Sequence, residues 1–291
     1  MMNSYKHLVI VLFSLVSSWL FAQESFIKLP AEDLNLFVED VGNGQPIIFI
    51  PGWTMTTEFF KHQKDHYAKD YRYVSYDPRS QGKSTKTENG NTYEIHAQDL
   101  HHLITELKLE NAILVGWSSG CATVFEYVQQ YGTKNLDRLV LIDEPPKWIG
   151  DSESEWVYGT FDGYRGSLKN LLSDPEGYAK AVVDWMLETE ISQTEEDWMI
   201  AETLQTPKYA ALSLYIDGLV SDYNEIVKNI NGKIPALYMV RNGWYNEASH
   251  WLQNQAPKAK CVPITSHAMF WESPEEFNGL LDGFLNSNTT K

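Results

Sequence analysis

The chain has 291 residues, 43% of them hydrophobic, so it is long enough for one large α/β domain or one domain with an inserted lid, and these values exclude an intrinsically disordered protein. Its 39 acidic and 23 basic residues give a net charge of −16 at pH 7. A surface this acidic argues against nucleic acids and anionic membranes as partners, because it repels polyanions.

The first residues have the pattern of a secretory signal peptide. A short polar start containing Lys6 precedes an apolar run of 15 residues from Leu8 to Ala22. The run is shorter than the ~20 residues that a membrane-spanning helix needs, although an uncleaved anchor is the alternative. We expect residues 1–22 to be removed before Gln23, which would leave a secreted or periplasmic protein that does not contact the membrane.

Strand and helix patterns alternate along the rest of the chain, which predicts a mostly parallel sheet covered by helices. The expected strands are 26–29, 34–41, 46–50, 71–76, 112–115, 138–142, 235–240 and 259–264. The expected helices are 56–69, 93–107, 121–131, 247–254 and 274–285. The first two strands are expected to form an antiparallel hairpin at the edge of the sheet.

The alternation breaks between Lys147 and Lys228, where the chain is helical in pattern, aromatic and acidic. A Pro-Pro pair at 145–146 marks the start of this segment, and an Asn-Gly pair at 231–232 marks its end. We therefore expect a helical cap at 145–232, inserted into a core formed by 23–144 and 233–291.

The most informative motif is Gly-Trp-Ser-Ser-Gly at residues 116–120, which follows an apolar strand pattern and precedes a helical pattern. A strand, a sharp turn holding a serine and a helix are what a G-x-S-x-G nucleophile elbow requires. Glycines flank the serine because larger side chains would collide in so tight a turn. The motif predicts that the hydroxyl of Ser118 is exposed at the carboxyl edge of the sheet.

A serine nucleophile needs a base, and His267 is the candidate. It follows the last expected strand and precedes the final helix, so its loop can bring the imidazole over the sheet edge. His62 and His66 have the i, i+4 spacing of a metal site, but no H-E-x-x-H pattern accompanies them, and we expect a solvated helix face there.

The acid that orients the base has more than one candidate. The strand after the expected cap is followed by residues 241–245, none of which is a carboxylate. The preceding strand runs directly into Asp143 and Glu144. We favour Asp143, with Glu144 and Glu247 as alternatives.

An oxyanion hole needs two backbone N–H donors. Ser119 follows the nucleophile and offers one of them. The loop after strand 46–50 offers the other through Trp53, because Pro51 has no N–H and Gly52 allows a close turn. Trp53 and Trp117 flank the expected centre and are candidates for narrowing the substrate pocket.

Together with the elbow, two further segments resemble the α/β-hydrolase superfamily over most of the mature chain. Residues 77–84 read Asp-Pro-Arg-Ser-Gln-Gly-Lys-Ser and are similar to the family's D-x-R-x-x-G-x-S loop. Residues 267–277 read His-Ala-Met-Phe-Trp-Glu-Ser-Pro-Glu-Glu-Phe and are similar to the family's last segment, in which the catalytic histidine precedes a Glu-x-Pro element.

The resemblance implies a doubly wound, mostly parallel eight-stranded sheet with a cap over the site. It also implies a triad of Ser118, Asp143 and His267, with Trp53 and Ser119 as oxyanion donors. Some members carry the acid after the strand that precedes the cap, which supports Asp143.

These patterns predict a serine hydrolase that cleaves a carboxylic ester of a small, largely apolar molecule through an acyl-enzyme, with no metal or organic cofactor. The alternatives on the same scaffold are another acyl or C–C hydrolase, a lactonase, a perhydrolase and an aminopeptidase. A non-catalytic ligand-binding protein is a further alternative.

Overall fold

The computed structural model describes residues 23–30, 33–150 and 155–287, so the expected signal peptide lies outside the described residues. An eight-stranded sheet runs through the molecule in the order β1-β2-β4-β3-β5-β6-β7-β8. The strands are β1 (Gln23–Lys28), β2 (Asn35–Gly42), β3 (Pro46–Ile50), β4 (Arg72–Tyr76), β5 (Ala112–Trp117), β6 (Leu136–Ile142), β7 (Ala236–Arg241) and β8 (Lys260–Ile264). The pairings of β1 with β2 and of β2 with β4 are antiparallel, and the other five pairings of the sheet are parallel. The expected fold class and the hairpin at the sheet edge are confirmed.

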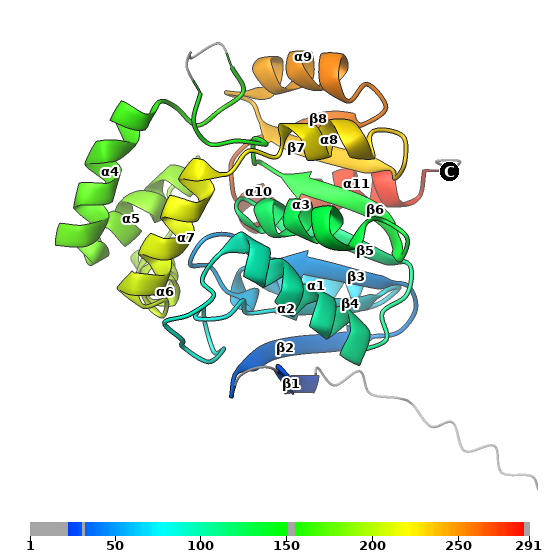
Figure 1. Ribbon diagram of the computed structural model, residues 1–291, viewed down its shortest axis with the longest axis horizontal. Coiled ribbons are helices and arrows are strands. Elements are labelled where there is room, and N and C mark those ends of the chain that lie inside the picture. Colours follow the sequence, from blue (N-terminus) through cyan, green and yellow to red (C-terminus); the bar gives the residue numbers. More distant parts are fainter. Residues whose placement is uncertain (1–22, 31–32, 151–154, 288–291) are drawn as a thin grey trace, which may run out of the picture.

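Helices cover both faces of the sheet (Figure 1). The helices of the core are α1 (Lys61–Tyr67), α2 (Tyr93–Glu106), α3 (Gly120–Tyr131), α8 (Asn224–Ile230), α9 (Tyr245–Gln255), α10 (Met269–Glu272) and α11 (Pro274–Leu285), with a 3-10 turn, η1 (Thr57–Phe60), before α1. Buried residues of α2, α3, α8 and α9 form one apolar cluster, and those of α1, α10 and α11 form the other. The sequence patterns predicted each of these helices except α8, which lies within the expected cap, and α10.

The central strands are apolar because both of their faces are covered. Every residue of β3 and β5 is buried. Successive side chains of a strand point to opposite faces, so Ile48 and Ile50 join one apolar cluster while Ile47 and Phe49 join the other. This two-sided burial explains the continuous apolar runs and brings the carboxyl ends of β3, β5 and β6 to one edge.

Four helices lie beyond that edge (Figure 1). In the chain they come after β6 and before β7. They are α4 (Phe161–Ser173), α5 (Pro175–Met186), α6 (Gln193–Leu204) and α7 (Lys208–Val220). Local signals begin three of them: Thr160 caps α4, Asp174 caps α5, and Ser192 forms a capping box with Glu195 at the start of α6.

The two ends of this helical layer meet beside the core. Lys147 forms an antiparallel bridge with Asp222, and the amide of Tyr223 donates to the carbonyl of Pro146 at 2.8 Å. Helix α8 follows this junction and contacts α3, although it falls within the limits 145–232 expected for the cap. The core and cap limits themselves stay a prediction.

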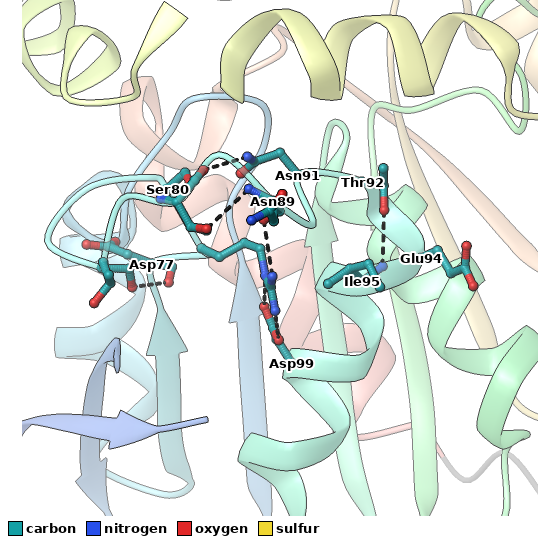
Figure 2. A network of polar contacts seen from close by, with 12 residues as sticks. Asp77, Ser80, Asn89, Asn91, Thr92, Glu94, Ile95 and Asp99 are labelled. Carbon is teal, nitrogen blue, oxygen red and sulfur yellow. Dashed lines mark hydrogen bonds and ion pairs between the residues drawn. The ribbon is translucent and has the colours of Figure 1, made fainter. Parts of the chain in front are cut away.

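The loop after β4 is held by buried charge (Figure 2). Asp77 accepts hydrogen bonds from the amides of Thr57 and Lys83 at 2.8 and 2.7 Å. Arg79 makes a two-pronged ion pair with Asp99 of α2, with N···O distances of 2.6 and 2.7 Å, and both side chains are only 5% exposed. The residues of the D-x-R-x-x-G-x-S motif therefore fix the position of this loop.

Asp99→Asn is expected to lower the free energy of unfolding by about 3 kcal/mol, because it removes the carboxylate that forms a two-pronged ion pair with the buried Arg79 guanidinium. Urea titration followed by tryptophan fluorescence measures the loss. Asp162→Asn is the control, since Asp162 and Arg165 form an exposed pair whose contribution is at most about 1 kcal/mol. Equal urea midpoints of unfolding for Asp99→Asn and Asp162→Asn would contradict the prediction.

Of the helices in the described ranges, none has the length and apolarity required to cross a membrane.

Candidate functional site

The elbow places Ser118 in a strained turn at the end of β5. Its φ of 53° is left-handed, and its amide donates to the carbonyl of Ile142 at 2.8 Å. A Cβ added to Gly116 would lie 2.8 Å from the amide nitrogen of Cys121, and one added to Gly120 would lie 2.3 Å from the carbonyl oxygen of Ile50. Both flanking glycines are therefore required by close backbone contacts, as the sequence predicted.

His267 and Asp143 meet at the same edge of the sheet. Asp143 directly follows β6, has a left-handed φ of 52°, and donates its amide to Met239 of the neighbouring strand at 2.8 Å. Its Oδ2 lies 2.7 Å from Nδ1 of His267. A carboxylate can only accept, so Nδ1 carries the hydrogen and Nε2 is left as the basic nitrogen.

Burial and charge set the ionisation of this pair. Burial opposes the charge on Asp143, but the hydrogen bond from His267, the charge that His267 carries when protonated and the charge of Arg241 hold the pKa of Asp143 below its usual value. Burial lowers the pKa of His267, which outweighs the raising effect of Asp143, and Arg241 lowers it further. His267 is therefore neutral, and able to accept a proton, at neutral pH.

Arg241 is a residue of this site that the sequence patterns did not identify. Its Nε donates to Oδ2 of Asp143 at 2.6 Å, and its amide donates to Oδ1 at 2.8 Å. Its guanidinium lies over the rings of Trp185 and Trp244, 4.0 and 4.5 Å from their centroids. The available signal was its position at the end of β7, directly after the expected strand 235–240.

Arg241→Gln is expected to shift the acidic limb of the kcat/KM profile to higher pH. The Arg241 charge lowers the pKa of His267, so its removal raises that pKa, and more of the base is protonated at mildly acidic pH. Activity at pH 6 therefore falls more than activity at pH 8.

Arg241→Lys is the matched control, because it keeps the charge and loses the planar guanidinium. Its acidic limb is expected to lie closer to that of the wild type than to that of the glutamine variant. An unchanged limb in Arg241→Gln would show that the charge does not act on the base.

The expected oxyanion loop lies against the elbow. A Cβ added to Gly52 would lie 2.9 Å from Cβ of Ser118 and 3.1 Å from the carbonyl oxygen of Trp117. In the described part of the chain, neither the Trp53 amide nor the Ser119 amide has a hydrogen-bond acceptor. Two backbone donors beside the serine are thus available to a ligand oxygen.

Gln81, from the loop after β4, holds the expected oxyanion loop through hydrogen bonds to its backbone. Its side-chain amide donates to the carbonyls of Gly52 and Met55 at 3.1 and 2.7 Å. The resemblance drew attention to the loop at residues 77–84, but only the structure shows that it supports the expected oxyanion donors.

Trp117 is fully buried, and its indole N–H donates to the carbonyl of His267 at 2.9 Å. Its ring packs against Phe59, Phe60 and Phe270. Trp117 borders the cavity described below, and its hydrogen bond also holds the histidine loop.

The two alternative acids lie elsewhere. Glu144 is buried and accepts hydrogen bonds from the indole of Trp148 and the phenol of Tyr158, and burial raises its pKa to about 8. Glu247 is exposed on α9. Of the three carboxylates, Asp143 is the one that contacts His267.

A cavity of about 480 Å³ opens over Ser118 and His267, a size typical of small-molecule sites. Helices α4, α5 and α7 contribute to its wall. Nine of its lining residues are aromatic: Trp53, Trp117, Trp148, Tyr158, Tyr164, Tyr178, Trp185, Tyr215 and Trp244. Among the described residues that line it there is no Asp, Glu, Lys or Arg.

His62 and His66 do not converge on one point. His62 packs against Trp271 with ring centroids 5.4 Å apart, and Nε2 of His66 lies 2.9 Å from Asp282. Across the ranges that the structure describes, three or more His, Cys, Asp or Glu side chains nowhere gather as a metal-binding group.

Comparison with known proteins identifies similar folds and sequences. A family model described as "alpha/beta hydrolase fold" matches residues 45–188. The AB hydrolase superfamily protein YisY of Bacillus subtilis is 26% identical, over 88% of this chain and 97% of that relative. An esterase (EaEST) from Exiguobacterium antarcticum superposes with a TM-score of 0.83 at 23% identity, and a bromoperoxidase from Bacillus anthracis with 0.84 at 21%. Each of these two alignments covers 91% of this chain and 100% of the other.

Proposed function

Because this chain belongs to the α/β-hydrolase superfamily, we propose that it is a serine hydrolase that cleaves a carboxylic ester of a small, largely apolar molecule. The observation that carries the proposal is the 2.7 Å contact between Asp143 and His267 at the wall of the cavity that also exposes Ser118. A nucleophile, a base and an orienting acid together are the requirements of acyl transfer.

In the proposed reaction, Nε2 of His267 accepts the hydroxyl proton of Ser118 as its oxygen attacks the ester carbonyl. Asp143 holds the ring in the required tautomer and stabilises the imidazolium that forms. The amides of Trp53 and Ser119 bind the oxygen as it gains negative charge. His267 then protonates the departing alcohol, which leaves an acyl group on Ser118.

Hydrolysis of the acyl-enzyme repeats these roles with water as the nucleophile. His267 removes a proton from the water, the same two amides hold the oxyanion, and the acid product leaves when Ser118 recovers its proton. The mechanism needs no group beyond this chain's own residues and water.

The lining of the cavity favours a neutral substrate. An aminopeptidase needs a carboxylate to bind a free amine, and the described residues of the cavity wall include none. Aromatic walls instead favour apolar or aromatic groups. Ester hydrolysis is therefore favoured over release of amino-terminal residues.

Covalent labelling tests the proposal directly. A fluorophosphonate probe is expected to modify wild-type protein at one site, with the mass shift on the peptide that contains Ser118. Ser118→Ala is expected to remain unlabelled while keeping its fold. Absence of labelling on folded wild-type protein would instead support a non-catalytic binding protein.

A substrate panel then separates the reaction types. We expect turnover of p-nitrophenyl esters of short to medium acyl length, and none of aminoacyl anilides. Faster turnover of lactones, of C–C bonds activated by carbonyl groups, or of peracid formation from hydrogen peroxide would assign one of those reactions instead.

We also propose export, on the amino-terminal sequence alone. The apolar run from Leu8 to Ala22 supports cleavage before Gln23. Amino-terminal sequencing of protein recovered from the native host is expected to begin at Gln23, and a start at Met1 would contradict the proposal.

A further inference from the structure

One part of the cavity wall gathers hydroxyl groups from three helices, whereas most of the rest is aromatic or aliphatic. Tyr164 and Ser167 come from α4, Tyr178 from α5 and Tyr215 from α7, and all four line the cavity. We refer to these four residues as the hydroxyl cluster.

The members of the hydroxyl cluster touch one another. The phenol of Tyr178 donates to that of Tyr215 at 3.1 Å, and the Ser167 hydroxyl interacts with both. The rings of Tyr164 and Tyr215 lie edge to face, with centroids 5.9 Å apart. Each hydroxyl can both donate and accept, so the hydrogen bonds within the cluster leave capacity for a ligand.

Most other polar atoms of the aromatic wall are committed to the protein. The indole of Trp53 donates to Ala211 at 2.8 Å, and that of Trp117 donates to His267 at 2.9 Å. Trp148 and Tyr158 both bind Glu144. The polar atoms of these four side chains are thus occupied by protein partners, which distinguishes them from the hydroxyl cluster.

The hydroxyl cluster lies beside the expected oxyanion loop. Trp53 packs edge to face against Tyr178 and Tyr215, with ring centroids 5.9 and 5.4 Å apart. The adjacent Gly52 is in close contact with Ser118. The cluster thus packs on the side chain of the residue that follows Gly52, whereas the ring of Trp185 packs on His267 with centroids 4.6 Å apart.

We propose that the substrate is a neutral aromatic ester whose ring carries a hydroxyl or methoxy group, and that the hydroxyl cluster binds this substituent. That the substrate is an ester rests on the proposed function, whereas the preference for a ring substituent rests on the residues of the cavity wall. The aromatic walls accommodate the ring. The absence of Asp, Glu, Lys and Arg among the described lining residues favours a substituent without charge.

The test compares substrates that differ only in the substituent. Methyl 3-(4-hydroxyphenyl)propanoate and methyl 3-phenylpropanoate form one pair, and 4-methoxyphenyl acetate and phenyl acetate form a second pair with the ring on the alcohol side. In at least one pair, we expect the substituted ester to have a kcat/KM about three- to tenfold higher than the unsubstituted ester. One neutral hydrogen bond contributes a difference of this size. Ratios of one in both pairs would overturn the proposal.

Tyr215→Phe assigns the preference to the hydroxyl cluster, because it removes only the phenolic oxygen. Its substituted-to-unsubstituted ratio is expected to fall close to one. Tyr209→Phe is the matched control: Tyr209 lies on the same helix, is 42% exposed and does not line the cavity, so its ratio and rates should equal those of wild type. A Tyr215→Phe variant that loses activity equally on both esters would show that the hydroxyl is structural.

A binding measurement separates this proposal from the proposed reaction. In Ser118→Ala, tryptophan fluorescence can report the binding of 3-(4-hydroxyphenyl)propanamide and 3-phenylpropanamide, which are both neutral. We expect the hydroxylated amide to bind more tightly by the same three- to tenfold, even if the wild type fails to hydrolyse esters. Equal dissociation constants would reject the subsite, whatever reaction the protein catalyses.

Discussion

Asp143→Asn is expected to lower kcat by about 10⁴-fold. The asparagine side chain can present an N–H toward Nδ1 of His267, which favours the tautomer with hydrogen on Nε2. That nitrogen can then no longer accept the proton of Ser118. Steady-state hydrolysis of a p-nitrophenyl ester measures the loss, and circular dichroism checks that the fold is retained.

Glu144→Gln is the matched control for the neighbouring carboxyl group. Burial raises the pKa of Glu144 to about 8, so this side chain is mostly neutral at pH 7 before substitution, and its contacts are Trp148 and Tyr158 rather than His267. We expect a loss of less than tenfold. A larger loss of kcat in Glu144→Gln than in Asp143→Asn would assign the orienting role to Glu144.

Gly52→Ala is expected to lower kcat by about 10³-fold, comparable to removal of one oxyanion donor. The added methyl group would lie 2.9 Å from Cβ of Ser118 and 3.1 Å from the Trp117 carbonyl oxygen, closer than side chains normally approach. Relief of this contact must move the oxyanion loop or the elbow. Either movement takes the Trp53 amide away from the developing negative charge.

Gly279→Ala on α11 is the control for the glycine-to-alanine change itself. A Cβ at that position meets nothing within 4 Å, and the residue does not line the cavity, so activity should be unchanged. Labelling of Gly52→Ala by the fluorophosphonate probe is expected to slow in parallel with kcat. Wild-type turnover in Gly52→Ala would place the oxyanion donors elsewhere.

Local sequence identified the parts of the site that depend on local geometry. A tight turn between a buried strand and a helix imposes glycine at 116 and 120, so the position of Ser118 was readable from five residues. A histidine after the last strand reaches the same edge because carboxyl ends of parallel strands share one side.

Arg241 shows what the sequence did not reveal. Its role depends on β6 and β7 being neighbours in register, although more than 90 residues separate them in the chain. An arginine at the end of a strand is ordinarily a solvated charge. Only the pairing of the two strands brings its guanidinium to Asp143, and helix α5 adds the ring of Trp185 over which it lies.

The sequence alone determined the fold class, the elbow and the candidate base, because apolar periodicity and turn sterics act over a few neighbouring residues. The tertiary structure decided which carboxylate contacts His267, which arginine accompanies it, and which aromatic hydroxyls face the cavity. The first two properties arise where the ends of neighbouring strands of the sheet meet, and the third arises where helices of the inserted segment cover that edge. Contacts between segments so distant in the chain leave no periodic signal in either segment.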